Sequence, residues 1–232
     1  MTLDAVVFDF DGLIIDSEWA IFETARDAFS VHGHELTVEA WATIVGLGDD
    51  DDDLAWSMLT AAMGIEGFDN AVFSATYRAQ PRANRDSLPL LPGIEVLVDS
   101  LVAVGVPIGV ASSSSLEWLD RHLGRLGLRP RFGAVVGADL VGGIGKPAPD
   151  VYLRACADLS ADPSRAVALE DSAHGIAAAK AAGMTAVAVP SRITRFNDFA
   201  RADLVVDSVA DLTVPLLEAL VHRATEPGSP VA

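Results

Sequence analysis

The chain has 232 residues, half of them hydrophobic, and a formal net charge of −17. This length and hydrophobic content suffice for a large buried core, built as one domain or as one domain with an insertion. The negative charge disfavours nucleic acid and anionic membranes as partners, because both would be repelled. The single cysteine, Cys156, excludes an internal disulfide framework and a zinc site with several cysteines.

Two features of the sequence argue against export and against a membrane span. Asp4 precedes the first apolar run and no basic segment does, so we expect no secretory signal. The most apolar internal stretch, residues 101–111, is interrupted by Gly105, Pro107 and Gly109 and is shorter than the roughly 20 residues of a membrane helix. We therefore expect a soluble, cytoplasmic and monomeric protein.

The first apolar run, residues 5–8, is followed directly by two carboxylates in the sequence FDFDG. The run predicts a strand buried on both faces, and a buried carboxylate without a partner is costly. Ligands bind at the carboxyl ends of strands in open α/β sheets, and Gly12 allows the backbone to approach a ligand closely. Asp9 and Asp11 therefore indicate a functional site, with a surface turn as the alternative.

Residues 16–87 lack a strand pattern and predict an inserted helical domain. Apolar residues recur at helical spacing in four segments, 19–31, 38–44, 54–63 and 68–80. The segment 89–93, PLLPG, predicts the return to the main domain, because proline suits a hinge and the start of a helix.

From residue 90 onward, helical and strand-like segments alternate. We expect helices at 94–104, 116–126, 151–159 and 175–182, and strands at 106–111, 132–136, 166–169, 185–189 and 203–206. This alternation predicts an α/β fold with a Rossmann-like parallel sheet covered on both faces. The core would comprise residues 1–15 and 88–232, with a disordered tail from Ala224.

Four polar segments follow predicted strands and should meet in one crevice. They are 9–11, the serine run 112–115, Lys146 and the segment 170–172. Carboxylate and backbone oxygens are the ligands that Mg²⁺ prefers, and a magnesium site beside hydroxyls and a lysine suits a phosphate group. Taken singly, the serine run and segment 170–172 also fit helix N-caps, and Lys146 fits a solvated loop.

Together these segments resemble a known family. The stretches DFDGLIIDSE, VASSSS, GKPAPDVY and ALEDSAHG resemble, in order and spacing, the motifs of the haloacid dehalogenase superfamily. The branch most similar holds β-phosphoglucomutase-like enzymes and small sugar-phosphate phosphatases. The resemblance implies a Mg²⁺-dependent phosphatase for a small phosphorylated metabolite, such as a sugar phosphate, a polyol phosphate or phosphoglycolate. It covers the predicted core, while the insertion matches only in position and helical character.

The resemblance also implies roles for individual residues. Asp9 would attack phosphorus and form an aspartyl-phosphate, and Asp11 would protonate the leaving oxygen and then activate water. Lys146 and Ser112 would bind phosphoryl oxygens and stabilise the transition state. The remaining implied sets are substrate binding by Ser113, Ser114 and Ser115, and Mg²⁺ binding by Asp9, Asp11 through its backbone carbonyl, Glu170 and Asp171.

Several features depart from particular relatives. Ile21 stands where mutases of this branch carry a histidine, and the run Asp49–Asp53 stands where they carry an arginine for a second phosphate. Five aspartates would repel that phosphate, although they also suit a solvated helix start. These departures favour hydrolysis over β-phosphoglucomutase-type transfer.

Three other chemistries are less compatible with the sequence. Residues 16–87 contain no lysine, which disfavours phosphonate hydrolysis through a Schiff base. The presence of Asp11 disfavours haloacid dehalogenation. A receiver-like phospho-switch uses a similar aspartate, Mg²⁺ and lysine, but it needs no long helical insertion and would hold its phosphoryl group instead of releasing it.

Overall fold

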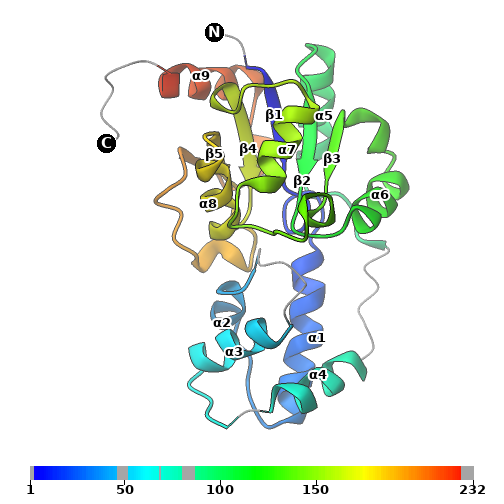
Figure 1. Cartoon of the computed structure of the whole chain (residues 1–232), viewed down its shortest axis with the longest axis vertical. Coiled ribbons are helices and arrows are strands. Elements are labelled where there is room, and N and C mark those ends of the chain that lie inside the picture. Colours follow the sequence, from blue (N-terminus) through cyan, green and yellow to red (C-terminus); the bar gives the residue numbers. More distant parts are fainter. Residues whose placement is uncertain (1–2, 46–51, 68, 80–86, 226–232) are drawn as a thin grey trace.

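The computed structural model describes residues 3–45, 52–67, 69–79 and 87–225, and its centre is a sheet of six strands. Neighbouring strands are parallel, in the order β3-β2-β1-β4-β5-β6. Their bounds are β1 Ala5–Phe8, β2 Ile108–Ala111, β3 Ala134–Val136, β4 Ala166–Glu170, β5 Thr185–Ala188 and β6 Leu204–Val205. The predicted α/β class with a parallel sheet is confirmed (Figure 1).

Helices cover both faces of this sheet (Figure 1). Alternation along β1 sends Val6 and Phe8 to one face and Ala5 and Val7 to the other. The first face carries α5 Ile94–Ala103, α6 Leu116–Arg125 and α9 Val214–Thr225, and the second carries α7 Asp150–Asp158 and α8 Ala173–Ala181. Short 3₁₀ segments lie between them, at η2 Arg129–Arg131, η3 Ala138–Val141, η4 Pro163–Arg165, η5 Thr194–Phe196 and η6 Val209–Asp211.

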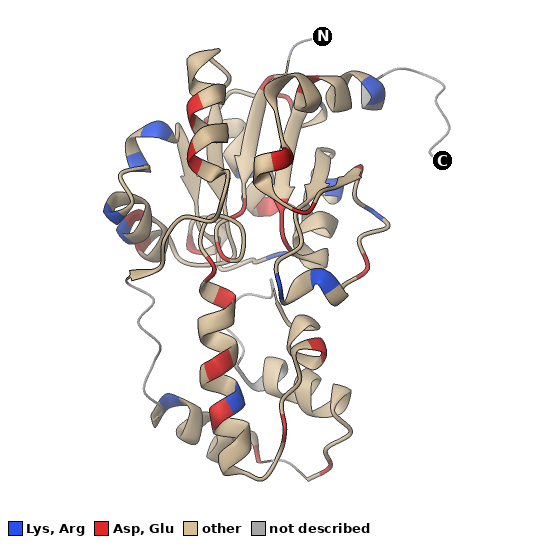
Figure 2. Ribbon diagram, turned by 180° about the vertical axis from the view of Figure 1, so that it is seen from behind, with Lys and Arg blue, Asp and Glu red and all other residues tan. Residues whose placement is uncertain are grey.

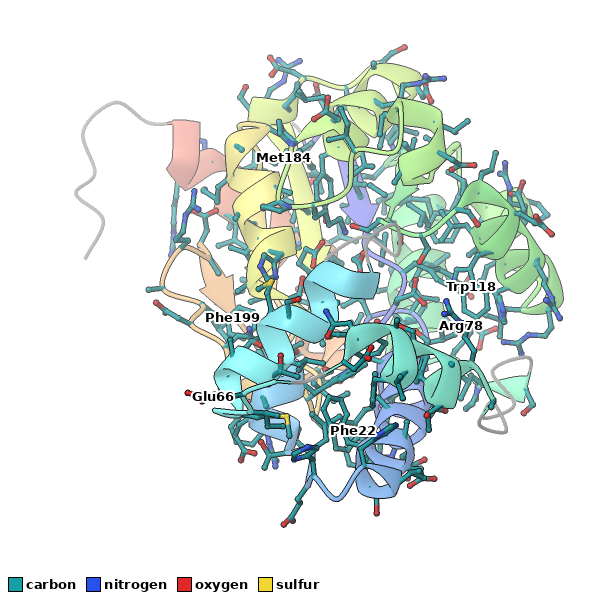
Figure 3. All side chains as sticks on the ribbon, turned by 60° about the horizontal axis from the view of Figure 1, so that its bottom comes forward. Phe22, Glu66, Arg78, Trp118, Met184 and Phe199 are labelled. Carbon is teal, nitrogen blue, oxygen red and sulfur yellow. The ribbon has the colours of Figure 1, made fainter. Side chains whose placement is uncertain are left out.

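Four helices between β1 and α5 form a separate group in the lower half of Figure 1. They are α1 Ser17–Val31, α2 Val38–Ala42, α3 Asp52–Ala62 and α4 Asn70–Ala79. Their core is aromatic: the ring of Phe73 lies 4.3 Å from that of Phe29 and 4.8 Å from that of Trp56. Phe22, labelled in Figure 3, belongs to the same cluster. The expected helices are confirmed, and the division into core and cap domains stays a prediction.

Two details of the chain differ from the sequence expectation or lie outside it. Helix α9 was not predicted, and it includes Ala224 and Thr225, so the expected disorder from Ala224 is wrong for these two residues. Residues 226–232 lie outside the described chain, as do Asp49 to Asp51 of the acidic run. The start of α3 at Asp52 agrees with an acidic helix start.

Among the described residues, no helix is long and apolar enough to cross a membrane. The cytoplasmic location and the monomeric state stay predictions.

Candidate active site

The loop after β1 is folded tightly against the end of β4. The backbone N–H of Asp9 donates to the carbonyl of Leu169 at 2.9 Å and continues the pairing of the two strands. Gly12 has a φ of +89°, and a Cβ at this position would lie 2.3 Å from Oδ2 of Asp171. Only glycine therefore fits this turn, and its absent side chain lets the loop lie directly on the Asp171 carboxylate.

Three buried carboxylates meet at this edge of the sheet. Asp9, Glu170 and Asp171 each offer an oxygen within 4.8 Å of the others, and none of the three is more than 6% exposed. They come together because β1 and β4 are adjacent and parallel, so both strands end at the same edge. The structure therefore brings together the three carboxylates that the sequence predicted to meet.

Lys146 lies within this carboxylate cluster. Its Nζ donates to Asp9 Oδ1 and to Glu170 Oε1, at 2.5 Å each, and the residue is 4% exposed. Burial alone would lower the pKa of Lys146, but the charges of Asp9 and Glu170 outweigh it and raise that pKa above its ordinary value. The lysine is thus an ammonium fixed in the site, and the solvated-loop alternative is wrong.

The cluster carries more negative charge than its lysine balances. Burial raises the pKa of Asp9 to about 8, with Glu170 adding to the rise and Lys146 opposing it. Burial, followed by the charges of Asp9 and Glu170, also raises the pKa of Asp171 well above its ordinary value. Three carboxylates facing one ammonium make a donor set of hard oxygens that fits a divalent cation such as Mg²⁺.

Glu170 is held from several sides. Its Oε1 accepts from the Tyr152 hydroxyl at 2.6 Å, and its Oε2 accepts from the Ser172 hydroxyl at 3.2 Å. A Cβ at Gly175 would lie 1.9 Å from Oε2, so the first turn of α8 leaves room for the carboxylate only because this residue is glycine. The role of Tyr152 was not predicted, since its place in α7 reads as an ordinary core position.

Asp11 points to a different set of partners. One carboxylate oxygen, Oδ1, accepts from the Ser17 hydroxyl at 2.5 Å and from the Trp118 indole N–H at 3.1 Å. The other, Oδ2, accepts from the Ser114 hydroxyl at 2.7 Å. The two aspartates of FDFDG are therefore separated into distinct environments, and the partners Ser17 and Trp118 were missed by the sequence analysis.

Each serine of the run 112–115 has its own protein partner. Ser112 is buried, and its Oγ accepts from the backbone N–H of Ser114 at 3.1 Å. The Ser113 hydroxyl accepts from the backbone N–H of Lys146, and Ser115 caps α6. The N-cap alternative thus holds for Ser115, as it does for Ser172 in α8. Contacts of these serines with a phosphoryl group or substrate stay a prediction.

The α1–α4 group contacts the sheet domain close to this site. Nδ1 of His174, in the first turn of α8, lies 3.0 Å from the carbonyl oxygen of Val45. Asn197 donates to the carbonyl of Ala42, also at 3.0 Å. Arg192 pairs with Asp16 at 2.8 Å and stacks over the Trp19 ring. The α1–α4 group therefore contacts α8 and the loop after β5, which both follow strands at the carboxyl edge of the sheet.

Fold and site together define an α/β protein with an acidic, lysine-containing centre at the carboxyl edge of a parallel sheet. The profile described as "Haloacid dehalogenase-like hydrolase" matches residues 6–189. YhcW of Bacillus subtilis (strain 168) is 32% identical over 215 residues, which are 93% of this chain and 96% of that protein. Hexitol phosphatase B of Escherichia coli (strain K12) is 34% identical over 212 residues, covering 90% of this chain and 94% of that one.

A solved structure agrees with these matches at the level of the fold. The crystal structure of β-phosphoglucomutase from Clostridium difficile superimposes with a TM-score of 0.73 and 21% identity, covering 96% of this chain and 98% of that chain. The chain belongs to the haloacid dehalogenase-like hydrolase family, together with relatives named as phosphatases. It is an enzyme of the hydrolase class, consistent with a phosphoric monoester hydrolase.

The charge balance of the cluster predicts how metal binding and stability depend on pH. The pKa of Asp9, about 8 in the folded chain, lies above the ordinary value of 3.8, so this group favours folding at low pH and loses that contribution as pH rises through its folded pKa. We expect the unfolding temperature of chelator-treated protein to fall between about pH 5 and about pH 8, and added Mg²⁺ to raise it more at the higher pH.

The control for this measurement is Asp171→Asn, which removes one ligand charge from the same cluster. Its Mg²⁺-induced rise in unfolding temperature should be much smaller than that of the wild type. An equal rise at both pH values, or an equal rise in the variant, would show that Mg²⁺ acts elsewhere.

Proposed function

We propose that this chain is a Mg²⁺-dependent phosphatase that hydrolyses a small sugar or polyol monophosphate through an aspartyl-phosphate on Asp9. The observation that carries the proposal is the division between the two aspartates. Asp9 lies in the buried cluster with Lys146, whereas Asp11 is held by hydroxyl and indole donors outside that cluster. Two carboxylates in separate environments suit separate roles as nucleophile and as acid and base.

The residues that would hold Mg²⁺ are the clustered Asp9, Glu170 and Asp171. The family resemblance adds the backbone carbonyl of Asp11. When bound, the ion would supply positive charge that reduces the repulsion between an anionic nucleophile and an anionic phosphate. Lys146 supplies a second, fixed positive charge in contact with Asp9. The ammonium also fixes the direction of the Asp9 carboxylate, which lowers the entropic cost of attack.

The reaction then divides into two displacements at phosphorus. In the first, an oxygen of Asp9 forms a bond to phosphorus while the bond to the substrate oxygen breaks, and Asp11 gives that oxygen its proton. In the second, Asp11 takes a proton from water, which attacks the aspartyl-phosphate and releases inorganic phosphate. Both carboxyl groups return to their starting states, so the cycle needs no further reactant.

The helices α1–α4 would act as a cap over this centre, with residues 16–87 as the cap and residues 1–15 and 88–232 as the core. Their aromatic cluster, whose buried residues all come from this segment except Ile193, supports this division, since a unit with largely its own core can move as a body. Their contacts with His174 and Asn197 lie beside the site and support closure over a bound phosphate. A closed cap would exclude bulk water and select the leaving group.

The charges of the cap favour hydrolysis over mutase chemistry. A mutase must bind the far phosphate of a bisphosphate, which requires cations on the cap. Within the described part of the insertion, the Lys and Arg residues are Arg26 and Arg78, while several acidic residues occur along α1 (Figure 2). Arg26 is exposed and lies beside Glu23 and Asp27. The structural likeness to β-phosphoglucomutase concerns the fold and does not alter this balance.

The choice between hydrolysis and transfer predicts the products. We expect stoichiometric release of inorganic phosphate from a hexitol or hexose monophosphate, with Mg²⁺ and without any bisphosphate. ³¹P NMR of the reaction with β-glucose 1-phosphate, with and without a bisphosphate primer, separates the two outcomes. Accumulation of glucose 6-phosphate without inorganic phosphate would establish a mutase, and a phosphoenzyme that forms once and persists would establish a switch.

A further inference from the structure

Asp11 is one of the points at which the core and the α1–α4 helices meet through side chains. The Ser17 hydroxyl comes from the first residue of α1, whereas Ser114 and Trp118 come from the loop after β2 and from α6. All three donate to the same carboxylate. This carboxylate is therefore oriented by three donors drawn from segments about a hundred residues apart in sequence.

The three donors are not equivalent. A serine hydroxyl rotates about its Cβ–Oγ bond and can transfer its hydrogen bond to water or to a ligand. The indole N–H is a donor only, and it lies fixed in the plane of its ring. Trp118 therefore sets the direction of the Asp11 carboxylate more rigidly than Ser17 or Ser114 does.

The ring of Trp118 is itself held from behind. Its centroid lies 3.9 Å from that of His122, which is fully buried. His122 Nδ1 accepts from the guanidinium of Arg125, and the same guanidinium donates to the carbonyl of Leu88 at 2.8 Å. Trp118, labelled in Figure 3, thus packs against His122. Through Arg125, His122 is linked to Leu88, in the segment that connects α4 to the core.

We propose that Trp118 is a positioning residue for the reaction: its indole N–H fixes the Asp11 carboxylate in the direction needed for proton transfer to and from the phosphate-bearing oxygen. The proposal rests on the proposed phosphatase function. A general acid must lie within hydrogen-bond reach of the oxygen that it protonates, and small misplacements of catalytic groups carry large rate costs.

The kinetic test is Trp118→Phe, which keeps an aromatic ring against His122 and removes the N–H. We expect kcat to fall about tenfold to a hundredfold while KM changes less than about threefold, because the phosphate-binding groups are untouched. A double-mutant cycle with Asp11→Asn locates the effect. If Trp118 acts through Asp11, Trp118→Phe should add nothing to the slow phosphoenzyme decay that Asp11→Asn already causes.

Two outcomes of this cycle would overturn the proposal. One is a Trp118→Phe variant with wild-type kcat. The other is an equal fold loss in the wild-type and Asp11→Asn backgrounds, which would place the effect of Trp118 elsewhere. An inactive wild type, by contrast, would reject the phosphatase function itself. The hydrogen bond between Trp118 and Asp11 can then still be tested by the spectroscopic measurement below.

A spectroscopic test needs no activity. The chain has four tryptophans, so a ¹H–¹⁵N spectrum should resolve four indole N–H signals, with that of Trp118 assigned from backbone resonances. Asp11→Ala should shift the Trp118 signal strongly, because its acceptor is lost. Asp120→Ala removes an exposed carboxylate of α6 that pairs with Arg129. This variant should leave the Trp118 signal in place. Equal shifts in both variants, or none in Asp11→Ala, would contradict the proposed contact.

Discussion

We expect Asp9→Asn to abolish turnover and to leave the fold intact. An amide is a poor nucleophile, so we expect kcat to fall by at least about a thousandfold. The substitution keeps the size of the side chain and removes one of three carboxylates that are buried together, so no cavity forms and the repulsion from Glu170 decreases. Phosphate release gives the rate, and circular dichroism with thermal unfolding gives the integrity of the fold.

The matched control for this variant is Asp120→Asn, an exposed carboxylate on α6. It should retain wild-type activity, since it lies outside the site. Turnover of Asp9→Asn within about tenfold of the wild type would reject the nucleophilic role, because even a general acid or base contributes about a hundredfold or more.

Asp11→Asn separates the two halves of the reaction. With a good leaving group such as p-nitrophenolate, the first displacement needs no acid, so the aspartyl-phosphate should still form. The second displacement lacks its base, and we expect the phosphoenzyme to decay at least about a hundredfold more slowly than in the wild type. Asparagine keeps a side-chain oxygen that can accept from Ser17 and Trp118, so the local packing should survive.

Rapid-quench measurement of protein-bound phosphate follows both steps in one experiment. The expected trace rises quickly to nearly one phosphoryl group per chain and then declines slowly. If the variant forms no phosphoenzyme under conditions in which the wild type turns over, Asp11 has a different role from the one proposed.

The sheet and the acidic centre could be predicted because both follow from local patterns. Short apolar runs predict buried strands, and the carboxyl ends of parallel strands share one edge. Asp9, Lys146 and the pair Glu170–Asp171 each follow such a run, so their convergence required no knowledge of distances. The serines were grouped correctly, but successive residues at a helix start point in different directions, which gave each one a separate partner.

The features that were not predicted depend on tertiary packing, which local sequence patterns do not reveal. Helix α9 was not predicted, although Pro215 lies in its first turn, where proline is compatible with a helix. Tyr152 and Trp118 lie in amphipathic helices, where an aromatic residue is usually part of the core. Their hydrogen bonds to Glu170 and Asp11 span 18 and 107 residues of sequence, and tertiary packing alone decides them.

The central claim is that Asp9 carries the phosphoryl group. The most direct measurement is borohydride reduction of the phosphoenzyme trapped with Asp11→Asn, followed by peptide sequencing, because reduction converts an aspartyl-phosphate to homoserine. The account predicts homoserine at position 9, formed only after incubation with substrate and Mg²⁺. Homoserine at another aspartate, or a phosphoryl group that resists reduction because it is bound to serine or histidine, would contradict it.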